Sequence, residues 1–147
     1  MSDRPLSDDV RALQVIWLAI VGGAVLAVAV LWWVAGRSAN AAPMAESADV
    51  LFMLNALASA GAIVVGFALQ RMIPARVMSQ DTEEAAFGQV RALGIASVAV
   101  MEASALTAGV AAFLTGNALN LAFVLPFLAF AALFFPSGAR VASLMRR

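Results

Sequence analysis

Glu102 is the residue whose type and position could do chemistry in this chain. It lies in the apolar run LGIASVAVMEASALTAGVAAFLTG, and the nearest charged residue, Arg91, stands eleven positions earlier. A carboxylate at bilayer depth costs several kcal/mol unless it is protonated, paired or hydrated, and such residues often mark proton or ion pathways. We therefore expect Glu102 to be protonated and to bind or relay a proton or a cation.

Two other interpretations of Glu102 remain open. The carboxyl could be a neutral, hydrogen-bonded group that fixes helix packing, and such bonds in membranes average about 0.6 kcal/mol. It could also face lipid or a quinone. For the whole protein, the alternative to ion binding is a structural or accessory subunit that packs against a larger membrane complex and catalyses nothing.

Three further residues are expected near Glu102. A helix rises about 1.5 Å per residue, which puts Glu102 about 15 Å from the cytoplasmic boundary, near the midplane of a core about 30 Å thick. Ser59 and Gly61 reach the same level, and Ser104 follows two positions after Glu102. A serine hydroxyl can pair with a carboxyl, and a glycine lets helices approach closely. The predicted ion- or proton-binding set is Glu102, Ser59, Gly61 and Ser104, although Ser104 could instead bond back to its own helix.

Composition places the chain in a membrane. Hydrophobic residues make up 63% of the 147 residues and charged residues 12%, whereas soluble domains average roughly half apolar and a quarter charged. Helices of about 20 apolar residues span a bilayer. We predict an all-α polytopic membrane protein, one domain over residues 1–147, with four transmembrane helices in an antiparallel bundle at about 13–35, 50–69, 82–115 and 118–135.

The residue inventory excludes several chemistries. The chain has no Cys, His, Lys or Tyr, so imidazole or thiolate ligation, thiol redox chemistry and a lysine Schiff base are ruled out. We expect no metal, no cofactor and no enzymatic activity. The expected partners are the lipid bilayer and other membrane subunits, either further copies of the chain or a larger complex, and no nucleic acid.

The arginines predict the orientation. Eight of the nine fall before the first span, between the second and third, or after the fourth; they are Arg4, Arg11, Arg71, Arg76, Arg91, Arg140, Arg146 and Arg147. Arg37 alone falls on the other side. The positive-inside rule therefore predicts that both termini are cytoplasmic. Together with the Ala-rich, Lys-free usage, this points to a bacterial inner membrane.

Local signals predict where the helices begin and end. Trp32 and Trp33 should lie at the outer membrane interface, and Trp17 near the inner one, as an aromatic belt. Pro74 should disturb or end the second helix. Asp81, with Glu84 three residues later, fits an N-cap and its reciprocal partner at the start of the third helix.

The connection between the third and fourth helices is short. Gly116-Asn117 permits only a tight turn. We therefore expect these two helices to be antiparallel neighbours.

The segment MEASALTAGVAAFL, Met101 to Leu114, resembles the second helix of the rotary ATP synthase c subunit. That helix has a mid-membrane carboxylate followed by small and aliphatic residues. The second span, with Gly61 and Gly66, and the cytoplasmic loop after it follow the hairpin order of the same family. The resemblance implies that Glu102 carries a proton or a sodium ion. The chain departs from the sodium-binding members of that family at residue 103, which is Ala where those members often have a hydroxyl.

The whole chain also resembles small bacterial four-helix membrane proteins. The shared features are an acidic residue in the third helix and a closing Phe-Phe-Pro, here Phe134–Pro136. This second resemblance supports the four-helix fold and implies no particular function.

Overall fold

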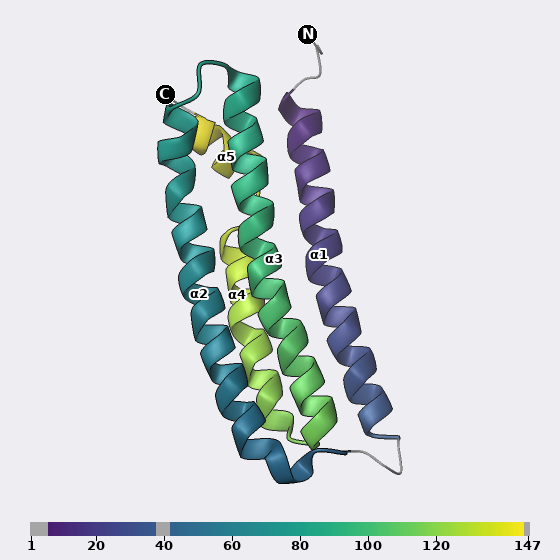
Figure 1. Ribbon diagram of the computed structural model, residues 1–147. Coiled ribbons are helices and arrows are strands. Elements are labelled where there is room, and N and C mark those ends of the chain that lie inside the picture. The colour runs from purple at the N-terminus through teal and green to yellow at the C-terminus, as the bar shows by residue number, and fades with distance from the viewer. Residues whose placement is uncertain (1–5, 38–41, 146–147) are drawn as a thin grey trace.

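The structure is a computed structural model that describes residues 6–37 and 42–145 (Figure 1). Its elements in chain order are α1 (Leu6–Ala35), the 3-10 helix η1 (Ala45–Ser47), α2 (Ala48–Met78), α3 (Glu83–Thr115), the 3-10 helix η2 (Ala118–Phe123), α4 (Val124–Leu133) and α5 (Gly138–Met145). No strand occurs in these residues. The predicted all-α class is confirmed.

The longest helix, α3, is the centre of the bundle. In Figure 1 it runs between α1 and α2, with α4 against α2 and α3. Half of its most apolar window, 50%, is buried, against 17% in α1 and 22% in α2. The outer helices are therefore held mainly through α3, and most of their surface is free to face other molecules.

Within residues 6–37 and 42–145, three helices are long and apolar enough to cross a membrane. They are Ser7–Ala35, Ala45–Met78 and Glu83–Thr115, and a fourth crossing exists if Ala118–Leu133 and Gly138–Met145 form one span bent by 68°. The prediction of a bundle of apolar helices is confirmed to this extent.

The helix predicted at about 118–135 is observed over nearly the same residues, Ala118–Leu133, but it is not α-helical throughout. The segment starts as a 3-10 helix, becomes α-helical at Val124 and ends at Leu133. Pro136, which is buried just beyond that end, lacks the N–H that would extend the helix and disfavours helical backbone before it. The chain therefore bends, and α5 starts at Gly138.

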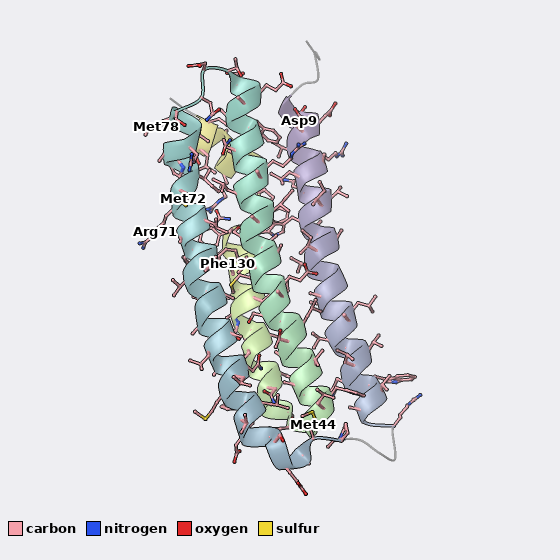
Figure 2. The ribbon with its side chains drawn as sticks, in the orientation of Figure 1. Asp9, Met44, Arg71, Met72, Met78 and Phe130 are labelled. Atoms are coloured by element: carbon pink, nitrogen blue, oxygen red, sulfur yellow. The ribbon has the colours of Figure 1, made fainter. Side chains whose placement is uncertain are left out.

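The surface of α2 is suited to lipid. Its inward residues recur every three or four positions and are small or polar for much of its length: Asn55, Ser59, Ala62, Gly66, Gln70, Ile73 and Val77. Large apolar side chains point outward instead, with Leu57 69% and Val64 68% exposed. In Figure 2, Met72 and Met78 likewise project from the outer side of α2. Since soluble helices show the opposite pattern, this face fits a bilayer.

Of the two predicted effects of Pro74, to disturb or to end the second helix, the latter does not occur, because α2 continues to Met78. Ile73 and Val77 are 2% and 1% exposed and pack against residues of α3. That packing supports the last turn. A proline so close to a helix end also interrupts little of the remaining hydrogen-bond ladder.

The cap of α3 is Thr82 and not Asp81. Thr82 has extended backbone, and its Oγ1 accepts a hydrogen bond from the Ala85 N–H at 3.2 Å. Both Thr and Asp serve as N-caps, so the helix start was predicted within two residues.

The predicted tight turn after α3 is confirmed. Gly116 has a φ of +66°, in the left-handed region that suits glycine. The Asn117 side chain then accepts a hydrogen bond from the Leu119 N–H at 3.0 Å. The turn lays η2 and α4 back along α3.

One end of the bundle gathers the start of α1, the α2–α3 connection and α5 (Figure 1). Val10 and Leu13 of α1 pack there with Phe87 and Val141. Of the described arginines, five lie toward this end: Arg11, Arg71, Arg76, Arg91 and Arg140. We call it the arginine-rich end. Arg37 lies at the opposite end, where its guanidinium sits 4.0 Å from the ring centroid of Trp33.

Candidate functional site

Glu102 lies on the side of α3 that faces α1. Val98 and Ala105, one turn before and one turn after it, are both fully buried. Gly109, two turns further on, meets Val28 of α1. Residues seven apart share a helix face. Glu102 is therefore at the edge of the α1–α3 contact, and it is half-buried.

The carboxyl of Glu102 has no partner within the described residues. None of them lies within hydrogen-bonding or ion-pairing distance of it. No charged side chain is fully buried in residues 7–37 and 42–145, so protein does not enclose Glu102. The inward positions beside it on α3 are taken by Val98, Met101 and Ala105, which leaves Glu102 at the rim.

Ser59 and Ser104 are brought together, but away from Glu102. Their hydroxyl oxygens are 2.7 Å apart, and the side chains are 3% and 6% exposed. Two positions along a helix correspond to a rotation of about 200°. Ser104 thus faces α2 while Glu102 faces α1. The two hydroxyls satisfy each other and do not serve the carboxyl.

Gly61 does not bring two helices into close contact. A Cβ placed on it would meet nothing within 4 Å. It lines an open groove of about 250 Å³ between α2 and α3, together with Ala58, Ala103, Ser104 and Thr107. The Thr107 hydroxyl bonds back to the Ala103 carbonyl at 2.8 Å. The groove is thus walled by small residues, and Glu102 does not line it.

Polar pairs not predicted from the sequence join α2 to its neighbours. The Asn55 amide donates to Oδ1 of Asn120 at 3.1 Å, and the Gln70 amide donates to the Ser97 hydroxyl at 2.7 Å. Asn55, Ser59 and Gln70 all belong to the inward stripe of α2. The inward residues of α2 recur at steps of three or four positions, and this spacing is the sequence pattern that indicates which polar residues face the bundle. Buried bonds of this kind hold transmembrane helices in register.

Side chains from two helices cap the end of α4. The Trp17 indole N–H donates to the Ala131 carbonyl at 3.2 Å, and Arg140 donates to the Leu133 carbonyl at 3.2 Å. The last carbonyls of a helix lack partners of their own, and leaving them unpaired in hydrocarbon is costly. The predicted position of Trp17 in an aromatic belt is wrong, because this side chain is 2% exposed and points into the bundle.

The predicted outer belt residues are exposed. Trp32 and Trp33 are 42% and 57% exposed at the far end of α1.

Arg140 has a second role, since it also lies 4.7 Å from the ring centroid of Phe134 and within 3.5 Å of Oε1 of Gln70. Phe130 is buried in the same region, among the helices of Figure 2. The bend after α4 is therefore held from α1, α2 and α5.

These positions limit the chemistry that Glu102 can do. A bound metal or sodium ion needs several ligand atoms, usually oxygens for hard cations. In the described part of the chain, no group of three or more acidic, His or Cys side chains could hold a metal ion. A single carboxyl can still hold and release a proton. Proton binding is therefore the chemistry that Glu102 can perform without ligands from another residue of the bundle.

Comparison with known protein families, curated proteins and solved structures found no match to this chain. The likeness of Met101–Leu114 to the c subunit therefore rests on those residues alone.

Proposed function

We propose that the protein is a small, non-enzymatic, four-span protein of the bacterial inner membrane in which Glu102 holds and exchanges a proton. One observation supports this most directly: Glu102 lies in a helix apolar enough to cross a membrane, half-buried and without a partner in the described residues. In such a place the neutral acid is the favoured form. Because the carboxyl is at the rim of the bundle, the proton would be exchanged with a neighbouring molecule.

The second candidate is a structural or accessory subunit of a larger membrane complex. It is favoured by the same exposure at the rim of the α1–α3 contact and by the apolar outer faces of α1 and α2. A protonated Glu102 would then donate a hydrogen bond to a partner helix and exchange nothing. Transmembrane helices commonly associate through such bonds.

Carbodiimide labelling tests the protonation state. A hydrophobic carbodiimide reacts with protonated carboxyls, so it should modify Glu102 in native membranes at neutral pH and modify it less as the pH rises. Glu102→Gln should abolish the adduct. Glu46→Gln, which changes an exposed carboxyl outside α3, should leave it intact. Failure of the native protein to react, with full reaction after acid denaturation, would argue against the proposal.

The Glu102→Gln variant also separates the two candidates. Gln keeps the size and can donate a hydrogen bond, but it cannot titrate. We expect its free energy of unfolding to stay within about 1 kcal/mol of the parent. If the protein exchanges protons, pH-dependent flux or growth should be lost. If it is an accessory subunit, the variant should copurify with its partner as the parent does, whereas Glu102→Ala should not.

Cysteine accessibility tests the proposed orientation. The chain has no Cys, so single substitutions provide a clean signal. Ala45→Cys should react with a membrane-impermeant maleimide in spheroplasts, and Ser79→Cys only after lysis, because the arginine-rich end should be cytoplasmic. The reverse pattern would place that end outside, and equal reaction at both sites would contradict an odd number of crossings between them.

A further inference from the structure

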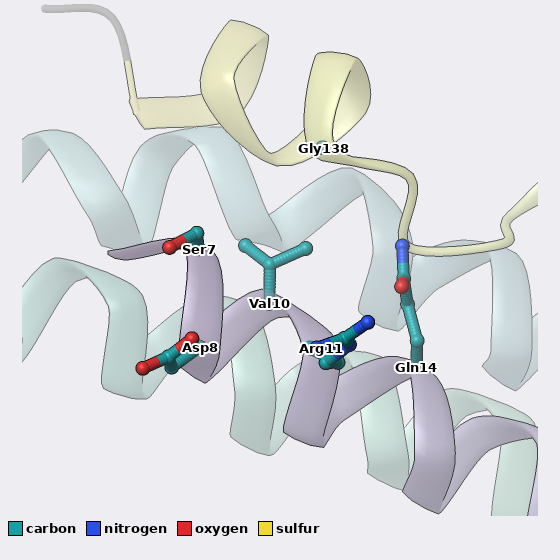
Figure 3. A pocket seen from close by; sticks show the side chains of 6 residues that line it. All are labelled: Ser7, Asp8, Val10, Arg11, Gln14 and Gly138. Atoms are coloured by element: carbon teal, nitrogen blue, oxygen red, sulfur yellow. The ribbon is translucent and has the colours of Figure 1, made fainter. Parts of the chain in front are cut away.

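A cleft separates the start of α1 from α5 (Figure 3). It has a volume of about 500 Å³ and is lined by Ser7, Asp8, Val10, Arg11 and Gln14 of α1 and by Gly138 of α5. The cleft lies at the arginine-rich end, just before α1 becomes continuously apolar. On a membrane-spanning helix, the change from polar to continuously apolar residues coincides with the boundary between headgroups and acyl chains.

The cleft presents two opposite charges that do not pair with each other. Asp8 and Arg11 are both exposed, one turn apart on α1. In Figure 3 the carboxylate and the guanidinium point away from each other along the helix. Neither forms an ion pair within the described residues. The cleft therefore has separate positions for an anionic and a cationic group, and no net charge.

Gln14 adds an oriented acceptor. Its amide nitrogen donates to the Pro136 carbonyl at 3.1 Å, which fixes the side chain against the bend before α5. The remaining amide oxygen can accept a hydrogen bond from a ligand. The Ser7 hydroxyl, one residue before Asp8 on α1, can also donate a hydrogen bond to the ligand or accept one from it.

Apolar side chains continue from the cleft along α1. Val15 is 61% and Leu18 58% exposed; Val15 directly follows Gln14 in the sequence, and Leu18 lies one helical turn after Gln14. A ligand whose polar part occupied the cleft would therefore find an apolar surface for its tail. This combination fits an amphipathic molecule of the bilayer better than a small soluble one.

We propose that the cleft binds the headgroup of phosphatidylethanolamine. The phosphate would meet Arg11, and the primary ammonium would donate to Asp8 and to the hydroxyl oxygen of Ser7, which lie together at one end of the cleft. A purely anionic headgroup satisfies Arg11 but leaves Asp8 next to another negative group. A quaternary choline group carries the charge but cannot donate hydrogen bonds. The proposal depends on the membrane location of the chain and is independent of any role of Glu102.

The test measures lipid binding to the full purified chain in detergent by native mass spectrometry. Phosphatidylethanolamine, phosphatidylcholine and phosphatidylglycerol with identical acyl chains are compared. The parent should retain the ethanolamine lipid roughly threefold to fivefold better than the other two, which is the range of an exposed charge pair. Asp8→Asn should remove that preference, and Arg11→Gln should weaken all three lipids.

Matched variants keep the result interpretable. Asp9→Asn changes the neighbouring carboxyl, which does not line the cleft, and should leave the preference unchanged. Arg11→Lys keeps the charge and should retain binding, which separates loss of charge from loss of folding. Equal retention of the three lipids by the parent, or a preference that survives Asp8→Asn, would overturn the proposal. So would displacement of the lipid by soluble phosphoethanolamine at equal concentration.

Discussion

Trp17→Ala is expected to lower the free energy of unfolding by about 2–3 kcal/mol. Trp17 is the largest of the fully buried side chains and belongs to the main core cluster with Val98, Phe127 and Phe130. Its ring also lies over Gly94, where an added Cβ would come within 3.9 Å of it. Removing the ring would leave a cavity among three helices.

The expected loss is smaller than the about 3–5 kcal/mol found for such truncations in soluble proteins. In a bilayer the unfolded reference is already surrounded by hydrocarbon, so little hydrophobic transfer energy is lost. What remains is the cavity and the unpaired Ala131 carbonyl, which loses the indole N–H at 3.2 Å. Trp17→Phe isolates part of this effect, since it keeps most of the ring and removes the donor.

Equilibrium unfolding in mixed detergent micelles would measure the effect. Trp33→Ala is the matched control, because that ring is 57% exposed, and it should change stability by about 0.5 kcal/mol or less. We expect the order of stability to be parent, then Trp17→Phe, then Trp17→Ala. Equal losses for Trp17→Ala and Trp33→Ala would show that Trp17 is an interfacial residue, as first predicted from its sequence position.

The long helices were predictable because apolar length is a strong signal. The third was expected at 82–115 and is observed as Glu83–Thr115. The apolar run predicts the second at about 50–69, but α2 continues through Pro74 to Met78, where Val77 packs against residues of α3. For the fourth, composition predicts the helix at Ala118–Leu133, but it reveals neither the 3-10 start nor the bend at Pro136.

The candidate site was harder to predict, because depth does not determine rotation. Counting residues correctly placed Ser59 and Ser104 at one level, and they form a hydrogen bond at 2.7 Å. The same count put Glu102 with them, although it faces α1. The inward stripe of α2, which includes Asn55 and Gln70, gives rotational information of this kind. For α3 the stripe is blurred, because α3 is contacted on several sides.

Glycines show the same limitation. The sequence predicts close packing at Gly61, yet a Cβ on it would meet nothing within 4 Å, and the same holds for Gly22 and Gly23 of α1. The close approaches occur at Gly66, next to Met101 and Phe130, and at Gly109. A glycine exposed to lipid and one pressed against a helix look alike in the sequence, so substitution is the way to tell them apart.

Gly109→Leu is expected to lower the free energy of unfolding by about 1–3 kcal/mol, because it disrupts the contact between α1 and α3. A Cβ at Gly109 would lie 2.9 Å from Cγ2 and 3.4 Å from Cα of Val28. Val28 is β-branched and stiff, so its side chain has little freedom to move aside. The new residue must instead displace α1, which α3 holds along much of its length. The free energy lost by this steric clash should exceed the gain in helix propensity, about 1 kcal/mol, that replacing a glycine within a helix gives.

Gly61→Leu is the matched control, at a site with open space around it, and it should be neutral or slightly stabilising in the same unfolding assay. A double-mutant cycle of Gly109→Ala with Val28→Ala locates the contact. Removing the Val28 methyls removes the 2.9 Å approach, so the double variant should be more stable than the sum of the single losses predicts. Strict additivity, or equal losses at Gly61 and Gly109, would mean that α1 does not pack on α3 at this point. It would also remove the reason for placing Glu102 at the rim of that contact.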